Sequence, residues 1–209
     1  MKFKKKVKDF FKKIWFLLWK DDSIKGWIFS VIFLLLFIKL IFFPGLSLIT
    51  GTKLPLAIVE SCSMYHQGNL FSNFNDWWQR HFLKYSEINI NQSEFQKFSF
   101  KKGFNKGDIL FIIGTPADKL KIGDVIVFQT NKANPIIHRI IKIKKQNNTL
   151  IFSTMGDNNN GQLNVEKEIN ENQIIGRAVF RIAPYLGWGK LIFFEPLRNP
   201  SERGFCREN

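Results

Sequence analysis

The chain has 209 residues, of which 45% are hydrophobic, enough to fill the core of one domain and too many for a disordered or collagen-like chain. Its two cysteines, Cys62 and Cys206, are too few for a disulfide framework or a cysteine-rich zinc site. The net charge of +14 is compatible with either a nucleic acid or an anionic membrane as partner. The position of this charge along the chain decides between them.

The first 20 residues hold eight lysines against a single acid, Asp9. These lysines alternate with aromatic and aliphatic residues, a pattern typical of a basic amphipathic helix on an anionic leaflet. A frayed basic tail is the alternative. We expect residues 1–22 to form a basic amphipathic cytoplasmic segment that contacts membrane lipids.

Residues 26–43 are apolar except for Ser30 and Lys39. As a helix they would span about 27 Å, close to the hydrocarbon thickness of a bilayer. Apolar residues continue past Pro44, which predicts a longer helix with a kink at the proline. We therefore expect a transmembrane anchor over residues 23–50, with Lys39 extending toward the far interface.

A basic start and an apolar run are also features of a cleavable signal peptide. Here the run is too long, and no small-x-small cleavage site follows it directly. We expect a retained, single-pass anchor in the cell membrane, with a cytoplasmic N-terminus and an extracytoplasmic domain, because lysine-rich flanks stay inside. An exported domain permits a Cys62–Cys206 disulfide, although two cysteines do not establish one.

The exported region, residues 51–195, contains several short β-branched segments separated by turn residues. These segments are residues 109–113, 125–128, 136–143, 149–154 and 173–182, with a strand-like stretch at 54–59 before them. Such spacing predicts a mainly β fold, an antiparallel sheet or barrel. A polar tail is expected over residues 196–209. A nucleic-acid partner is disfavoured, because this region shows no basic stripe or base-stacking motif.

Residues 65–106 differ from the rest, being aromatic, rich in asparagine and weakly periodic, and we expect them to form an insert. Within it, residues 75–85 fit an amphipathic helix. One interpretation places Trp77, Trp78 and Phe82 at the membrane interface, where indole rings are favoured. The other treats the helix as packing against the β domain.

Three polar sites stand at strand ends or inside apolar strands. They are Ser61 to Ser63 after the first strand-like stretch, His138 inside an apolar strand, and Asp157 in a Gly-Asp-Asn turn. Each alone is well explained as a structural residue. Together they supply a nucleophile, a base and an acid to orient that base.

The chain resembles the type I signal peptidases in five blocks that occur in the family's order. The blocks are residues 61–64, 107–110, 121–128, 137–140 and 156–159. His138 stands where the usual bacterial enzymes carry lysine, which is similar to the archaeal and endoplasmic-reticulum branch and suggests an archaeal source. The resemblance covers about residues 108–182, the anchor and residues 59–64.

The resemblance implies a signal-peptidase-like β-rich catalytic domain on a single N-terminal transmembrane helix. The implied activity is a serine endopeptidase that cleaves signal peptides from exported preproteins after small residues, with no metal or cofactor. It further implies Ser63 as nucleophile, His138 as general base and Asp157 as the acid that supports the base. The Ser63 backbone N–H and the Ser61 hydroxyl would form the oxyanion hole.

The chain also departs from the family's pattern. Many relatives have a second aspartate where this chain has Leu163, and Glu166 is the nearest downstream acid that could replace it. His66 lies close to Ser63 in the sequence and is a rival base without a matching motif. Cys62 is the stronger nucleophile in principle, but its side chain is expected to point away from a cleft that holds Ser63.

Two functional hypotheses follow from these observations. The first is an active signal peptidase whose partners are preproteins, membrane lipids and the protein translocation channel. The alternative is a catalytically inactive, membrane-anchored β domain that serves as a binding or scaffold protein. A Ser63→Ala change would separate them, because only the first hypothesis needs the hydroxyl.

Overall fold

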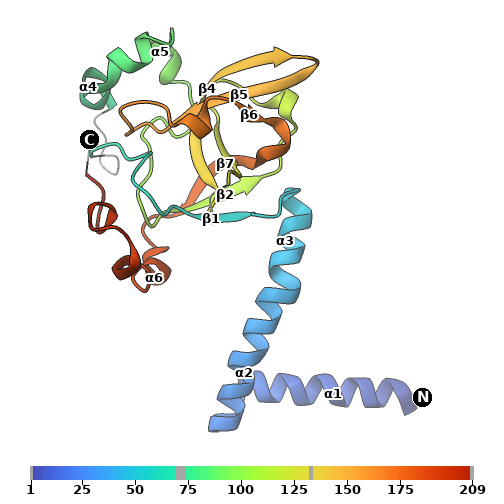
Figure 1. The fold of residues 1–209 in the computed structure, drawn as a ribbon. Helices are drawn as coiled ribbons and strands as arrows, with labels where there is room; N and C mark the ends of the chain where they lie inside the picture. The colour runs from blue at the N-terminus through green and yellow to red at the C-terminus, as the bar shows by residue number, and fades with distance from the viewer. Residues whose placement is uncertain (1, 69–73, 132–133, 208–209) are drawn as a thin grey trace. The chain divides into compact units, whose positions relative to one another are not determined.

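The computed structural model describes residues 2–68, 74–131 and 134–207. The chain divides into two compact units, Met1–Ile49 and Thr50–Asn209, and each is described by itself. The first unit is helical and the second is built on a β-sheet (Figure 1).

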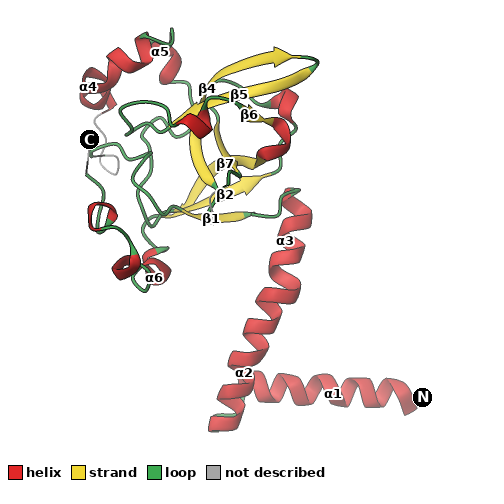
Figure 2. Cartoon of the chain, viewed as in Figure 1, coloured by secondary structure: helices red, strands yellow, loops and turns green. Residues whose placement is uncertain are grey.

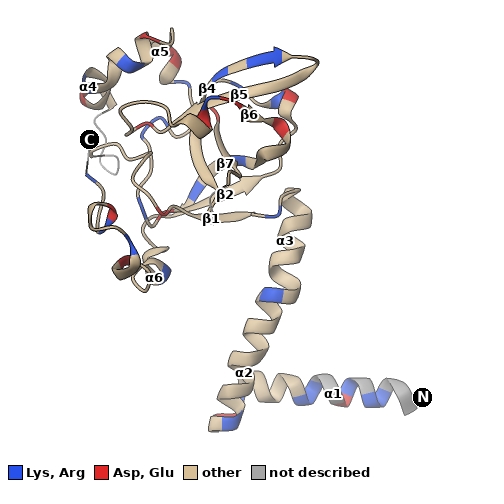
Figure 3. Cartoon of the chain, viewed as in Figure 1, with Lys and Arg blue, Asp and Glu red and all other residues tan. Residues whose placement is uncertain are grey.

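The N-terminal unit contains two long helical stretches. The first is α1 (Lys2–Trp19), and the second runs without a break through α2 (Ile24–Phe37), a π-helical turn (Ile38–Phe42) and α3 (Phe43–Thr50). Lysines gather on α1, whereas the second stretch is almost free of charge (Figure 3). Its 27 residues, Ile24–Thr50, are long and apolar enough to cross a membrane.

The start of this apolar stretch and its passage through Pro44 each have a local explanation. The Ser23 hydroxyl accepts the backbone N–H of Gly26 at 3.1 Å and so caps the start of α2. Near the other end, Pro44 has no N–H to donate to the preceding turn. The structure meets this with the π-helical turn Ile38–Phe42, in which the N–H of Phe43 reaches the carbonyl of Ile38. The expectation that the helix continues past Pro44 is therefore confirmed.

The second unit is organised around one antiparallel sheet of seven strands (Figure 2). The strands are β1 (Leu56–Ile58), β2 (Ile109–Ile113), β3 (Val125–Phe128), β4 (Ile136–Gln146), β5 (Thr149–Met155), β6 (Ile169–Asn170) and β7 (Ile174–Ala183). Their order across the sheet is β1-β2-β7-β3-β4-β5-β6. The expectation of a mainly β fold, preceded in the chain by a single N-terminal apolar helix, is thus confirmed.

The longest hairpin joins β4 to β5 through Asn147 and Asn148. Both residues have positive φ, 47° and 66°, the backbone conformation that a two-residue hairpin turn requires and that asparagine tolerates. Because this turn continues the pairing, β4 extends to Gln146. Strand β4 is therefore longer than the segment 136–143 expected from the sequence.

Strand β3 lies in the middle of the sheet, and all four of its side chains are buried. Val125 and Val127 pack into one cluster with β1, β2 and β7, whereas Ile126 and Phe128 pack into another with β4, β5 and β6. Alternate residues of a strand point to opposite faces, so both faces of the sheet are covered near β3.

The described part of the insert 65–106 contains two helices, α4 (Phe74–Ser86) and α5 (Gln92–Phe95), which lie together beside the sheet (Figure 1). The expected helix is present, but Trp77 and Trp78 are only 1% and 7% exposed. They belong to an aromatic cluster with Tyr85 and Phe95. A membrane contact for these two tryptophans is therefore wrong: they fill the core between α4 and the sheet, and only Phe82 of the three is exposed.

Short helices complete the second unit. They are α6 (Trp188–Leu191) and the 3-10 turns Ala117–Lys119, Asn164–Glu166, Glu171–Gln173, Glu195–Leu197 and Pro200–Glu202.

Candidate active site

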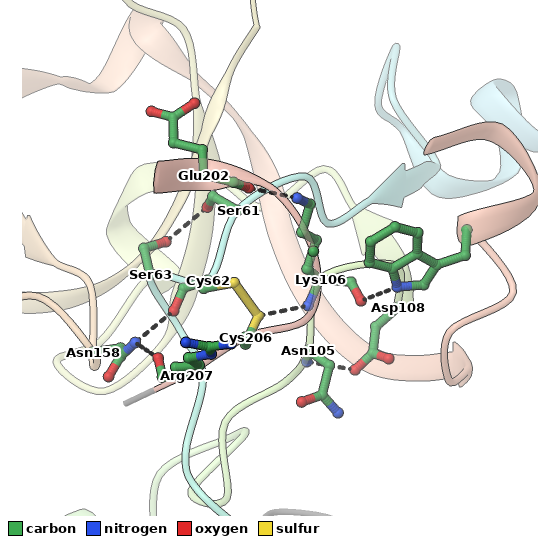
Figure 4. Close-up of a disulfide and its surroundings, with 12 residues drawn as sticks. Ser61, Cys62, Ser63, Asn105, Lys106, Asp108, Asn158, Glu202, Cys206 and Arg207 are labelled. Atoms are coloured by element: carbon green, nitrogen blue, oxygen red, sulfur yellow. Dashed lines mark hydrogen bonds between the residues drawn. A yellow bond between two sulfur atoms is a disulfide. The ribbon is translucent and has the colours of Figure 1, made fainter. Parts of the chain in front are cut away.

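The turn that follows β1 carries the serine block. The hydroxyls of Ser61 and Ser63 are hydrogen bonded at 3.1 Å, and Ser63 is partly exposed while the next residue, Met64, is buried. The side chain between the two serines, Cys62, forms a disulfide with Cys206 (Figure 4). Cys62 is thereby removed as a nucleophile, and the disulfide that the sequence only permitted is present.

The backbone of this block is held by two neighbouring segments. The N–H of Asn158 donates to the Ser63 carbonyl at 2.7 Å, and the N–H of Phe104 donates to the Met64 carbonyl at 3.0 Å. The loop after β5, which contains Asp157, therefore contacts the serine block through its main chain. The fold thus brings together Ser63 and the Gly-Asp-Asn turn, which are more than 90 residues apart in the chain.

His138 lies on β4, paired with Ile126 of β3, and is 4% exposed. Its Nδ1 atom is hydrogen bonded to Oε1 of Glu166, a fully buried carboxylate. That carboxylate also accepts the hydroxyl of Thr154 at 3.1 Å and the N–H of Leu163 at 2.7 Å. With Nδ1–H donating to Glu166, Nε2 is left unprotonated in the neutral ring and available as a base.

Asp157 lies in a different environment from the one expected. Arg139 donates two hydrogen bonds to its carboxylate, from Nε to Oδ1 at 2.9 Å and from Nη2 to Oδ2 at 2.6 Å. The Tyr85 hydroxyl donates to Oδ1 at 2.9 Å, and His66 Nε2 lies 2.9 Å from Oδ2. The structure thus brings Asp157 to Arg139, and it is Glu166 that reaches His138.

The alternation of side chains along β4 explains this difference. His138 and Arg139 are neighbours in one strand, so their side chains leave the sheet on opposite faces. Asp157 lies on the Arg139 face and Glu166 on the His138 face. A sequence motif places both acids after β5 but does not say which face each one reaches.

The charge of Asp157 is stabilised by its partners. Burial alone raises the pKa of the Asp157 carboxyl, but the Arg139 charge and the hydrogen bonds from His66 and Arg139 outweigh burial and hold this pKa well below its ordinary value. Burial and Asp157 together raise the pKa of the Tyr85 hydroxyl well above its ordinary value. Both groups therefore keep one protonation state near neutral pH.

His66, the rival base, is part of this buried cluster. Its ring stacks on Trp77 with 3.6 Å between centroids, and only 2% of its surface is exposed. Burial lowers the pKa of the His66 imidazole below its ordinary value, although Asp157 acts in the opposite direction. His66 therefore has the surroundings of a neutral packing residue.

Among the described residues, the Ser63 hydroxyl pairs with Ser61 and makes no hydrogen bond to His138. Sequence reasoning gave no role to Arg139 or Tyr85, the two principal partners of Asp157. Arg139 stood in a quoted motif directly after the histidine, and the alternation of a strand was the signal that could have assigned it to the other face.

No known family model matches the chain. The human signal peptidase complex catalytic subunit SEC11C is 33% identical over 101 residues, which are 45% of this chain and 52% of the relative. The Candida tropicalis subunit SEC11 is 28% identical over 103 residues, 46% of this chain and 61% of the relative. The chain spans about half the length of the human relative that it matches.

These relatives are eukaryotic, so the expectation of an archaeal source finds no support in them. They agree with the resemblance read from the sequence blocks, since each is described as a catalytic subunit of a signal peptidase complex. Over the aligned region, the chain is homologous to the catalytic subunits of signal peptidase complexes.

Proposed function

We propose that this protein is a membrane-anchored serine endopeptidase that removes N-terminal signal peptides from exported preproteins. The observation that carries the proposal is the buried His138–Glu166 pair in a chain homologous to signal peptidase subunits. An acid on Nδ1 fixes the tautomer that a general base needs. The pairing also supports the proposal where the chain departs from the family's pattern, because Glu166 would take the place of the missing aspartate.

The proposed reaction begins with the attack of Ser63 Oγ on the carbonyl that precedes the cleaved bond. His138 Nε2 takes the hydroxyl proton and passes it to the leaving amine, while Glu166 stabilises the imidazolium. The Ser63 N–H and the Ser61 hydroxyl would stabilise the oxyanion, each donor contributing about 3–4 kcal/mol in comparable enzymes. Water activated by His138 then hydrolyses the acyl-enzyme.

Asp157 has a positioning role in this proposal. Its carboxylate holds Arg139, and the N–H of the next residue, Asn158, bonds the carbonyl of Ser63. The Arg139–Asp157 pair would therefore keep the loop that supports the nucleophile in place. Catalytic hydrogen bonds are often formed only in the substrate complex, which is where we expect Ser63 to turn from Ser61 to His138.

The edge of the sheet supports the choice of an extended peptide as substrate. Strand β1 is terminal in the strand order, so its outer edge is not paired within the described sheet, and Ser61 follows β1 by three residues. A peptide that adds to this edge as a further strand would pass beside Ser63. Small residues before the cleaved bond would then be selected by shallow pockets.

The N-terminal unit supports a location at the membrane. We place α1 on the cytoplasmic leaflet, where its lysines contact anionic lipid headgroups and its exposed Trp15 and Trp19 enter the interface. The apolar helix Ile24–Thr50 would cross the cell membrane and hold the β domain outside, where preproteins leave the translocation channel.

The proposal is tested with membranes that contain the wild-type chain, the Ser63→Ala variant or the His138→Ala variant. A preprotein with an Ala-x-Ala signal site is added and its size shift is followed. We expect processing by the wild type, and a loss of at least about 10³-fold in both variants, as when a member of a serine triad is removed. Equal processing by wild type and Ser63→Ala would overturn the assignment of the nucleophile. If a control peptidase processes the preprotein and this chain does not, the result favours the hypothesis of an inactive scaffold protein.

A further inference from the structure

The C-terminal segment is tied covalently to the serine block. Cys206 forms a disulfide with Cys62, the residue between Ser61 and Ser63, across a sequence separation of 144 residues (Figure 4). The Cα atoms of the two cysteines are 5.3 Å apart. The segment around Cys206 is therefore linked by one covalent bond to the residue beside the candidate nucleophile.

Asn158 forms a second link between the same parts. Its side-chain amide donates to the Cys62 carbonyl at 3.1 Å and to the Arg207 carbonyl at 3.0 Å. Its backbone N–H donates to the Ser63 carbonyl at 2.7 Å. One residue thus joins the serine block, the loop after β5 and the C-terminal segment.

The C-terminal segment is itself anchored to the domain by Lys106, whose side chain is 1% exposed. The Lys106 ammonium donates to the Glu202 carbonyl at 2.7 Å, and its backbone N–H lies 3.5 Å from the Cys206 sulfur. Phe205 packs on Trp188 with 4.9 Å between ring centroids. The C-terminal segment is therefore fixed to the rest of the domain at several points.

We propose that residues 202–207 act as a clamp that positions Ser63 for catalysis, with Cys62, Cys206 and Asn158 as its positioning residues. The inference rests on the proposed function of Ser63. The serine block lies in a turn outside the ladder of β1, so its position depends on contacts such as these. Rates of acyl transfer are sensitive to the position of the nucleophile, and a displacement of about 1 Å costs on the order of 10²-fold.

The test compares the full chain in detergent micelles with a Cys62→Ser/Cys206→Ser double variant. Serine keeps the size and leaves no free thiol, so the lost covalent link is the principal change. Leu197→Ser, at an exposed position of the same C-terminal region, is the matched control. Three quantities are measured: kcat and KM for a preprotein, the folded fraction at the assay temperature, and hydrogen exchange at the amides of residues 61–64.

We expect kcat of the double variant, compared with the wild type at an equal folded fraction, to fall by about 10-fold to 10²-fold. Its KM should stay within twofold of the wild-type value. The amides of residues 61–64 should exchange faster than in the wild type. The control should match the wild type in all three quantities. An unchanged kcat, or a kcat that falls only with the folded fraction, would overturn the clamp. If the wild type itself does not process the preprotein, the proposed function fails, and unchanged exchange at residues 61–64 would then reject the clamp separately.

Discussion

The two faces of β4 carry two buried pairs made by adjacent residues, and the pairs differ in what they can do. On one face His138 meets Glu166, and on the other Arg139 meets Asp157. Both acids are fully buried. The difference lies in the base, because an imidazole can take and release a proton near neutral pH whereas a guanidinium stays charged.

The two pairs therefore have different expected roles: His138–Glu166 in the reaction, and Arg139–Asp157 in the stability of the fold. Arg139 also donates to the carbonyls of Ser99, Phe100 and Gly123, so its pair with Asp157 joins the insert to the sheet. Glu166 receives hydrogen bonds from Thr154 and from the turn at Leu163, which hold it against the histidine. We expect changes on the first face to lower stability and changes on the second to lower the rate.

The largest effect is expected for Glu166→Gln. The amide keeps the shape but no longer fixes the imidazole in the required tautomer or stabilises the imidazolium, so kcat should fall by about 10³-fold to 10⁴-fold while the protein stays folded. Preprotein processing and circular dichroism measure the two quantities. Glu168→Gln, an exposed acid two residues away, is the control and should keep full activity. If Glu166→Gln kept wild-type activity, the proposed role of Glu166 in the reaction would be wrong.

Asp157→Ala should lower the stability of the protein, in contrast to Glu166→Gln, which should lower the rate. It leaves the fully buried Arg139 without its carboxylate partner, and breaking a buried ion pair costs about 3–5 kcal/mol of unfolding free energy. Urea unfolding followed by tryptophan fluorescence measures this change, with the exposed Asp118→Ala as control. A fully stable variant that had lost only its activity would contradict this stability role and assign Asp157 to the reaction or to the position of Ser63.

The smallest expected effect is a dependence of stability on pH. The folded pKa of His66 lies below its ordinary value, so on acidification the unfolded chain binds a proton there first, and stability falls as the pH drops below about 6.5. Asp157 adds a second loss below about pH 4, since its folded pKa is also depressed. One proton contributes a slope of at most about 1.4 kcal/mol per pH unit.

His66→Gln tests the first of these two losses. It should flatten the stability curve just below about pH 6.5. A loss below about pH 4 should remain, because Arg139 still lowers the pKa of Asp157. Urea unfolding at a series of pH values gives both slopes. An unchanged slope above pH 5 would assign that loss to another group.

Local sequence was sufficient for most of the strands. The segments 109–113 and 125–128 fold as β2 and β3 with the expected bounds, because runs of β-branched residues between turns favour strands wherever the chain packs them. The burial of Trp77 and Trp78 was not predictable in this way. An amphipathic helix shows the same pattern whether its apolar face meets a bilayer or a sheet.

The sequence by itself determined the apolar stretch long enough to cross a membrane, the β-rich unit after it, and the set of residues that resembles a peptidase. Only the tertiary structure decided that Glu166 and not Asp157 reaches His138, and that Cys62 pairs with Cys206. The physical reason is the same for both. Composition and periodicity act over a few neighbouring residues, whereas these contacts join residues separated by 28 and 144 positions, whose approach depends on how the whole sheet folds.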